Sequence, residues 1–241
     1  MLAHSLNDVL ALLDNAAVSA QRPVPRLLAV SKTQPATAIA ALATAGQRAF
    51  GENYVQEAAG KQLALAELAE WGAPLPTLEW HLIGHLQSNK AGQAARLFDW
   101  VQTVDRASLV AALARHRPLE REPLNVLVQV NVDDEASKHG CHPGALAALA
   151  DAVAAQPRLR LRGLMVIPTP HTDIERRRPA FRRSRALFDE LRERYPQLDT
   201  LSMGMSDDCA IAIAEGATMV RVGTALFGSR APTILASEDP A

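Results

Sequence analysis

Short apolar segments alternate with alanine-rich segments along most of this 241-residue chain. The first segment, from about Leu6 to Ala20, has the spacing of apolar positions that is typical of an amphipathic helix. The short apolar runs after it, each followed by an alanine-rich segment, have the rhythm of repeated strand–helix units. We predict eight strands, at Arg26–Val30, Arg48–Phe50, Leu78–Ile83, Phe98–Thr103, Leu124–Asn131, Leu161–Val166, Leu198–Ser202 and Thr218–Val222.

This alternation determines the predicted fold class. Strands separated by helices form a parallel sheet, and eight of them favour a closed barrel over an open, doubly wound sheet. The chain length also suits a (β/α)8 barrel, which typically takes about 250 residues. We therefore predict an α/β protein with a single (β/α)8 TIM barrel and an extra N-terminal helix over residues 1–230. Residues 231–241 contain proline and no helix or strand pattern, which predicts a flexible tail.

Residues at the predicted helix ends agree with this organisation. Asn53 and Asp105 are suited to cap the starts of two helices, and Gly46 and Gly216 to close the ends of two others. The segment Glu175–Arg194 is rich in charge and includes three consecutive arginines. We interpret it as the solvated face of a helix, with a patch for an anion or a partner as the alternative.

Charge and composition narrow the class of partner. Basic and acidic residues number 25 and 26, so the net charge of −1 gives no general attraction to nucleic acid or to an anionic membrane. No segment offers the roughly 20 apolar residues that span a bilayer. The two cysteines, Cys141 and Cys209, lack metal-ligand spacing and cannot form a disulfide framework, which fits a reducing cytoplasm. We expect a cytoplasmic protein that binds a small molecule.

Polar residues follow most of the predicted strands, and in a barrel these strand ends share the face on which active sites are built. Lys32 stands where the apolar run of the first strand ends. Partial burial there would lower the pKa of its amine towards the neutral form, which is the form that reacts with an aldehyde. A lysine that extends from a strand end into water is the alternative interpretation.

Two glycine-containing turns near the C-terminus suggest a phosphate site. One lies in SMGMS at 202–206 and the other in VRVGTALFG at 220–228. Backbone N–H groups and the hydroxyls of Ser202, Ser206 and Thr224 could donate to phosphate oxygens, and Gly223 would permit close approach. Neither turn is a recognised phosphate motif, so each alone could be structural. With Lys32 as a neighbour in a closed barrel, they fit a phosphorylated aldehyde.

Three further residues are candidates for contact with the ring of such a ligand. Arg221 could face a pyridine nitrogen, and because guanidinium hardly gives up a proton, the ring would be a weak electron sink; an ion pair in the barrel mouth is the alternative. His81 and Asn53 could reach the ring, or they could be a core histidine and a helix cap. No histidine, cysteine or carboxylate spacing indicates a metal.

The segments around these residues resemble the YggS/PROSC family of pyridoxal-phosphate homeostasis proteins. The resemblance covers nearly the whole chain. It is carried by the two C-terminal segments together with AVSKT at 29–33, FGENYVQE at 50–57, WHLIGHLQSNK at 80–90 and GLMVIP at 163–168.

The resemblance implies a barrel similar to the N-terminal domain of alanine racemase, of the fold type III class that binds pyridoxal 5'-phosphate (PLP). Lys32 matches the lysine that forms the internal aldimine, and Arg221 matches the pyridine-side arginine. Ser206, Gly223 and Thr224 match phosphate-side positions. Asn53, His81 and Met203 are placed around the cofactor by the same analogy. Family members bind PLP and influence vitamin B6 balance without an established reaction.

We therefore expect a monomeric PLP carrier with no catalytic residues and no metal, in transient contact with apo forms of PLP enzymes. A PLP-dependent racemase or lyase is the alternative, although no second acid–base group opposite Lys32 is evident. A barrel that binds another phosphorylated metabolite without an aldimine is a third hypothesis. Lys138 follows the fifth strand and could accept the aldehyde transiently, or it could be a simple loop lysine.

Overall fold

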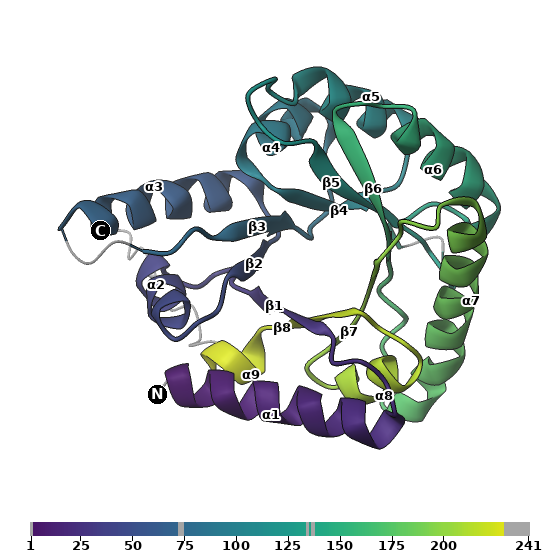
Figure 1. The fold of residues 1–241 in the computed structure, drawn as a ribbon, viewed down its shortest axis with the longest axis horizontal. Coiled ribbons are helices and arrows are strands. Elements are labelled where there is room, and N and C mark those ends of the chain that lie inside the picture. The colour runs from purple at the N-terminus through teal and green to yellow at the C-terminus, as the bar shows by residue number, and fades with distance from the viewer. Residues whose placement is uncertain (1, 72–74, 134, 136–137, 229–241) are drawn as a thin grey trace, which may run out of the picture.

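The computed structural model describes residues 2–71, 75–133, 135 and 138–228. Within these residues, eight parallel strands pair in chain order and close into one barrel, with the first strand beside the last (Figure 1). The predicted TIM barrel is confirmed, and each predicted strand overlaps an observed one. The strands are β1 Arg26–Val30, β2 Ala49–Glu52, β3 Glu79–Leu82, β4 Trp100–Val104, β5 Leu124–Gln129, β6 Leu159–Met165, β7 Thr200–Met205 and β8 Met219–Val222.

Helices surround the barrel, and a helix follows each strand in the chain (Figure 1). Short 3-10 turns precede three of these helices, at Ser88–Lys90, Pro143–Ala145 and Ile174–Arg177. The α-helices of the described residues are α1 Leu2–Ala20, α2 Ala36–Thr44, α3 Val55–Trp71, α4 Ala91–Leu97, α5 Ala107–His116, α6 Leu146–Ala154, α7 Arg178–Arg194, α8 Cys209–Ala214 and α9 Thr224–Phe227.

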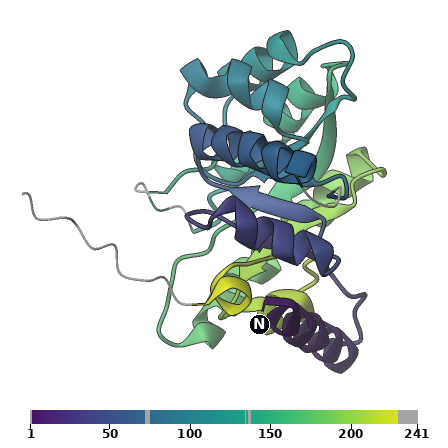
Figure 2. The same cartoon turned by 90° about the vertical axis from the view of Figure 1, so that its left-hand side faces the viewer.

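The additional helix α1 confirms the predicted N-terminal element. Its buried residues Leu6, Val9, Leu13 and Ala17 recur at the spacing of one helical face. That face packs against α8 and α9, so the two ends of the described chain lie side by side (Figures 1 and 2). The apolar stripe that is visible in the sequence therefore covers α8 and α9, the helices before and after β8.

The side chains of the strands divide between two environments. On β7, Leu201 and Met203 belong to the large hydrophobic core that the helices cover, whereas Ser202 points to the opposite side of the strand, into the barrel. Small apolar clusters such as Trp100, Leu127 and Met165 form separately from the main core. Buried polar groups accompany them, which leaves the barrel interior partly polar.

The two glycines predicted to follow helices are confirmed, and the prediction that Asp105 caps a helix is wrong. Gly46 and Gly216 have φ of +114° and +92° and follow α2 and α8, a backbone conformation that favours glycine. The N-cap of α5 is Arg106, without a side-chain cap, because Asp105 bonds Arg106 instead. Asn53 lies two residues before α3 begins at Val55.

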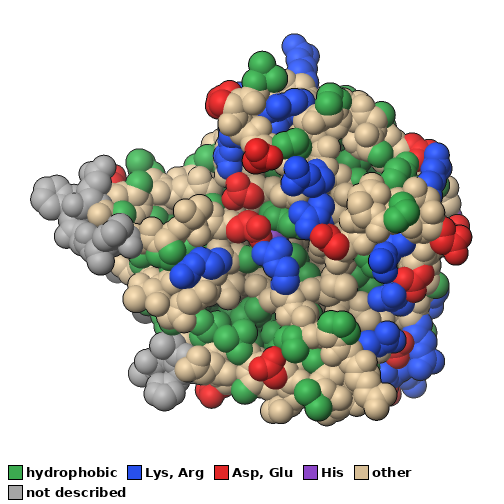
Figure 3. Space-filling model, viewed as in Figure 1, with side chains coloured by type: hydrophobic (Ala, Val, Ile, Leu, Met, Phe, Trp, Pro, Cys, Tyr) green, Lys and Arg blue, Asp and Glu red, His purple; other side chains and the backbone are tan. Residues whose placement is uncertain are grey.

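The charged segment Glu175–Arg194 forms ion pairs with residues outside it, which a purely solvated helix face would not do. Arg177 forms an ion pair of 2.6 Å with buried Asp208, and Arg178 and Arg182 both pair with Glu215. Figure 3 shows basic and acidic side chains intermingled on the face seen in Figure 1, with a basic cluster beside α7. No helix among the described residues is long and apolar enough to cross a membrane. The predicted tail at 231–241 lies outside the described residues.

Candidate functional site

Barrel closure brings Lys32 and the two glycine turns to neighbouring strand ends. Lys32 comes two residues after β1, Ser206 one residue after β7, and Gly223 one residue after β8. Since β8 pairs with both β1 and β7, these ends lie at the same edge of the barrel. A Cβ on Gly223 would approach the backbone oxygen of Val30 to 3.2 Å, so the ends of β1 and β8 are closely packed.

A buried polar network holds the turn that carries Lys32. Ser31 is fully buried, and its hydroxyl donates to Glu52 Oε1 at 2.6 Å. Lys61 Nζ, from α3, donates to the Ser31 backbone oxygen at 2.7 Å and to the same Glu52 oxygen at 2.8 Å. A third bond from Lys61, of 2.7 Å, reaches Glu57. This network fixes the backbone immediately before Lys32.

The same turn requires an unusual backbone conformation. Thr33 has φ of +65°, in the left-handed region that few residues other than glycine adopt. Its backbone N–H donates to Glu57 Oε1 at 2.5 Å, and its hydroxyl donates to the Lys32 backbone oxygen at 2.6 Å. These bonds offset the local strain, and Lys32, which is half-buried, is held at the barrel mouth.

The electrostatics distinguish the two lysines of this region. Burial raises the pKa of Glu52 above its usual value, although the bonds from Lys61 and Ser31 oppose the shift. Glu52 Oε2 has no hydrogen-bond partner in the described structure, so the carboxylate depends on Lys61 for compensation. Lys61 is therefore a structural cation, and Lys32 is the amine that the fold places at the mouth.

The turn after β7 is built by Gly204 and Asp208. Gly204 has φ of +91°, and a Cβ there would lie 2.5 Å from the Ala212 side chain, so only glycine fits. Buried Asp208 accepts from the Met205 backbone N–H at 2.6 Å and from Arg177. Ser206 lies within this fixed turn, one residue after β7, and is half-buried.

The turn after β8 opens directly into a short helix. Gly223 is the N-cap of α9, and its carbonyl accepts from the N–H groups of Leu226 and Phe227. Thr224 is the first helical residue and is exposed. The first N–H groups of a helix have no partner within the helix, so this turn offers donors to an anion.

Arg221 lies in β8 and its side chain is buried in the barrel. It donates to Ser202 Oγ at 2.8 Å and to the Val166 backbone oxygen at 2.9 Å. Burial lowers its pKa to about 10. The alternative prediction of an ion pair is wrong, because both described partners are neutral. A buried cation with neutral partners is stabilised by any further acceptor atom, as a bound ligand would supply.

The structure does not place the His81 side chain at the mouth. His81 lies in β3, fully buried, with Nε2 bonded to Glu79 at 2.6 Å and Nδ1 bonded to Gln102 at 2.8 Å. Its ring stacks on Trp100 at a centroid distance of 5.0 Å. With both ring nitrogens engaged, it matches the alternative of a core histidine.

Ser202 and Met203 are likewise removed from the mouth because β7 continues to Met205, three residues beyond its predicted end. The Ser202 hydroxyl donates to Gln102 at 2.7 Å and accepts from Arg221, so it has no proton left for a phosphate. The Met203 side chain is fully buried in the outer core. In this structure the Ser202 hydroxyl therefore connects Gln102 to the Arg221 guanidinium.

Asn53 and Lys138 lie in loops at the strand ends. Asn53 is half-buried and lines a cavity of about 350 Å³ together with Gly84 and His85. Lys138 Nζ donates to Thr169 Oγ1 at 2.8 Å and lies 3.7 Å from Asp133 Oδ2. Lys138 is therefore engaged in a polar cluster, in contrast to the simple loop lysine of the alternative interpretation.

Sequence reasoning missed the residues that support the site. Glu52, Lys61 and Asp208 are buried charged residues that bond the turns around Lys32 and Ser206. The only sequence signal was a carboxylate beside each candidate segment, Glu52 in FGENYVQE and Asp208 after SMGMS. Lys61 gave no signal, because a lysine in the middle of a helix is normally exposed.

Comparisons with known proteins agree with this geometry. The sequence profile of the family described as alanine racemase, N-terminal domain, matches residues 8–231. The pyridoxal phosphate homeostasis protein of Escherichia coli (strain K12) is 51% identical over 231 residues, covering 95% of this chain and 97% of that one.

Solved structures extend the likeness to the fold. PipY of Synechococcus elongatus PCC7942, solved without PLP, is 40% identical and covers 95% of this chain and 100% of its own, with a TM-score of 0.82. The same protein with PLP bound gives a TM-score of 0.78. Alanine racemase from Corynebacterium glutamicum shares the fold at 20% identity, with a TM-score of 0.63 and coverage of 97% and 62%. The chain therefore belongs to the family with the alanine racemase N-terminal domain and, within it, to the YggS/PROSC group of pyridoxal phosphate homeostasis proteins.

Proposed function

We propose that this protein binds pyridoxal 5'-phosphate at the barrel mouth and holds it in reserve as part of vitamin B6 homeostasis. In this proposal Lys32 supplies the amine, Ser206, Gly223 and Thr224 receive the phosphate, and Arg221 faces the pyridine nitrogen. The observation that carries the proposal is the convergence of these groups on three adjacent strand ends. PLP supplies an aldehyde that condenses reversibly with an amine, and a phosphate that anchors it.

The residues fit that ligand in their charge and their shape. The glycine turns leave backbone donors beside two hydroxyls, which suits a phosphate dianion. Arg221 brings a buried positive charge with neutral partners to the same end of the barrel. Asn53 lies at the neighbouring end of β2 and remains a candidate for contact with the ring.

The site favours storage over turnover. Arg221 retains its proton, because even the lowered pKa of about 10 lies well above neutral pH. A ring nitrogen that only accepts a hydrogen bond from it withdraws electrons weakly, which disfavours carbanion chemistry. Two groups that could serve as an acid or a base are already engaged: His81 is buried with both nitrogens bonded, and Lys61 is held by two carboxylates. This arrangement supports a carrier.

An absorption titration tests the binding proposal. Addition of PLP to the wild type should produce the absorption change of aldehyde–amine condensation, saturating at one equivalent. Lys32→Ala should abolish it, and Lys90→Ala, a control at the end of a surface turn, should not. Condensation that survives in Lys32→Ala would contradict the proposed site.

A second assay separates the carrier from a racemase or lyase. The PLP-loaded protein is incubated with amino acids in deuterium oxide, and loss of the α-proton is followed by NMR. No exchange across a panel of amino acids is expected, and exchange that disappears in Lys32→Ala would establish catalysis. A third hypothesis, a phosphometabolite barrel, predicts phosphate binding without condensation.

The remaining parts of the proposal concern assembly and location. We infer a monomer that transiently contacts apo PLP enzymes to deliver the cofactor, in the cytoplasm. Two free, buried cysteines, Cys141 and Cys209, support a reducing compartment. Sedimentation at several protein concentrations tests the monomer, and transfer of PLP to an apo enzyme faster than PLP dissociates into solution tests the delivery contact.

A further inference from the structure

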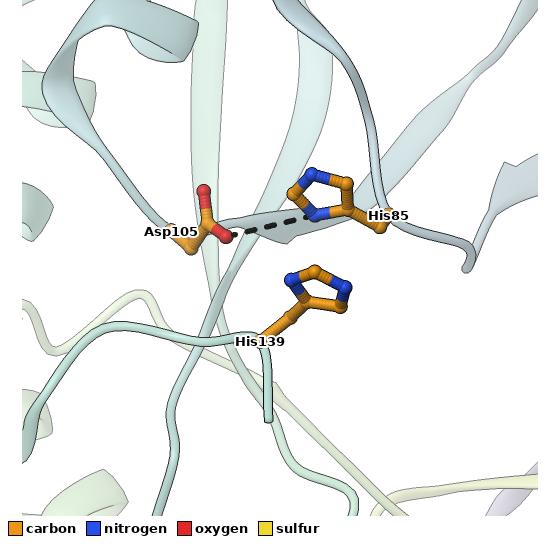
Figure 4. A group of neighbouring side chains, drawn as sticks. All are labelled: His85, Asp105 and His139. Carbon is orange, nitrogen blue, oxygen red and sulfur yellow. Dashed lines mark ion pairs between the residues drawn. The ribbon is translucent and has the colours of Figure 1, made fainter. Parts of the chain in front are cut away.

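Two histidines and an aspartate from three successive loops converge at the same end of the barrel as Lys32. His85 follows β3, Asp105 follows β4, and His139 comes from the loop after β5 (Figure 4). One potential ligand atom from each lies within 4.8 Å of those of the other two. His85 Nδ1 lies 3.9 Å from Asp105 Oδ2, and the two imidazole rings stack at 3.8 Å.

The loop of His85 is fixed by bonds on both sides of that residue. The Thr103 hydroxyl donates to the Gly84 backbone oxygen at 2.8 Å, and Arg106 Nη2 donates to the Leu86 backbone oxygen at 2.9 Å. A Cβ on Gly84 would lie 2.1 Å from the Asn53 backbone oxygen, so this loop is packed tightly against its neighbour. The backbone of His85 is therefore held in place.

Asp105 and His139 are held in a similar way. Arg106 Nη1 bonds Asp105 Oδ1 at 2.6 Å, which leaves Oδ2 directed towards the histidines. The His139 backbone oxygen accepts from Gln129 Nε2 at 3.2 Å. Gly140 has φ of +121°, and a Cβ there would lie 2.7 Å from the Asn131 backbone nitrogen, so the chain turns sharply after His139. The backbones that carry the two histidines are therefore held in place, and Arg106 bonds both the His85 loop and Asp105.

Imidazole nitrogen and carboxylate oxygen are the ligands that zinc and neighbouring divalent metals prefer. In a tetrahedral zinc site, bonds of about 2.0–2.1 Å place the ligand atoms about 3.4 Å apart. The present separations require shifts of roughly 1 Å, which rotations of two exposed imidazoles supply without backbone movement. The bond from Arg106 to the second Asp105 oxygen is of the kind that orients a metal-ligating carboxylate.

We propose that His85, Asp105 and His139 form a binding site for a zinc-class divalent ion, which joins the loops after β3, β4 and β5. Three protein ligands leave a fourth position for water or an external ligand. The sequence pattern gave no sign of the site because its ligands are 20 and 34 residues apart along the chain. Its ligands come from the loops after β3, β4 and β5, whereas the groups proposed for the PLP amine and phosphate follow β1, β7 and β8; the two sets meet only at the cavity that His85 shares with Asn53.

Zinc titration of the apo protein, without an affinity tag and near neutral pH, tests the proposal. Calorimetry should show one equivalent of Zn²⁺ per wild-type chain. His85→Ala and His139→Ala should each weaken binding at least tenfold, because loss even of a residue that only orients a ligand costs about 10–100-fold. His116→Ala, which removes an exposed histidine at the end of α5, is the matched control and should bind as the wild type does.

Two additional measurements serve as controls for the calorimetry. Co²⁺ should give the visible absorption of a low-coordinate site in the wild type and not in the His85→Ala/His139→Ala double variant, and Mg²⁺ should not compete. Circular dichroism should show all variants folded. Lys32→Ala should retain zinc, so failure of PLP binding leaves this test intact. Absence of stoichiometric zinc, or equal uptake by the folded double variant, would overturn the proposal.

Discussion

Substitution of Lys61 by methionine tests the network behind Lys32. Methionine is unbranched and ends at Cε, so the change keeps most of the apolar stem and removes the ammonium, which bonds the Ser31 backbone oxygen, Glu52 and Glu57. Glu52 is fully buried and would then lack a cation. Removal of one partner from a buried ion pair typically costs about 3–5 kcal/mol, because the remaining charge is uncompensated. We expect Lys61→Met to lose about that much unfolding free energy at neutral pH.

The pH dependence identifies Glu52 as the cause. Burial already raises the pKa of Glu52, and loss of Lys61 should raise that pKa further. Below the unfolded pKa the carboxyl is protonated in both states, so the variant should approach the wild type there. As pH rises above that value, the unfolded state releases the proton and the folded state does not, so the deficit should grow until the folded pKa is passed.

Urea unfolding of four proteins measures these effects as a double-mutant cycle. Glu52→Gln with Lys61→Met removes both charges, and the double variant should fall within about 2 kcal/mol of the wild type, because neutral replacement of a buried pair is often tolerated. Lys90→Met, which removes a half-buried lysine outside this network, is the control for loss of a lysine. The network would be refuted if the loss of unfolding free energy in the double variant equalled the sum of the losses in the two single variants. It would also be refuted if the deficit of Lys61→Met did not depend on pH.

Three other substitutions test separate parts of the structure. Arg221→Gln should weaken PLP binding by about tenfold or more in the absorption titration, since a charge-assisted bond contributes about 1.5–3 kcal/mol; unchanged affinity would remove Arg221 from the site. Burial raises the pKa of Glu79, but the bond and charge of His81 outweigh it, so the pKa falls to about 2. The ionised Glu79 therefore stabilises the folded protein above the unfolded pKa, and this stabilisation is lost as pH falls from that value towards 2. Glu79→Gln should therefore flatten the acid limb of a stability–pH curve, and an unchanged limb would contradict this assignment. In thermal unfolding, Gly204→Ala should lower the unfolding free energy by about 1–3 kcal/mol or more. The control Gly60→Ala, inside α3 with open space around it, should be neutral or stabilising. Equal effects of the two substitutions would refute the requirement for glycine at 204.

The barrel could be predicted from sequence because its strands are short apolar runs separated by amphipathic helices, a pattern that local chemistry sets. The glycines at 46 and 216 were predictable for the same reason, since a positive φ after a helix favours glycine. Lys32, Ser206, Gly223 and Thr224 follow strands directly, so a correct strand order was enough to bring them together.

The sequence could not predict the direction of a side chain where that direction depends on tertiary structure. Ser202 ends the predicted strand and Met203 follows it, but β7 continues to Met205, so both residues lie inside the strand, on opposite sides of the sheet. His81 is directed into the barrel, where Glu79 and Gln102 occupy its nitrogens. Sequence spacing carries no information about such contacts, nor about the buried charge of Lys61.

Borohydride reduction tests whether Lys32 is the amine that holds PLP. Purified protein is mixed with PLP, reduced, digested and mapped by peptide mass, beside Lys32→Ala and Lys138→Ala. We expect a reduced adduct on the peptide that contains Lys32, present in Lys138→Ala and absent from Lys32→Ala. A specific adduct on another lysine of the wild type, or no specific adduct at all, would contradict it.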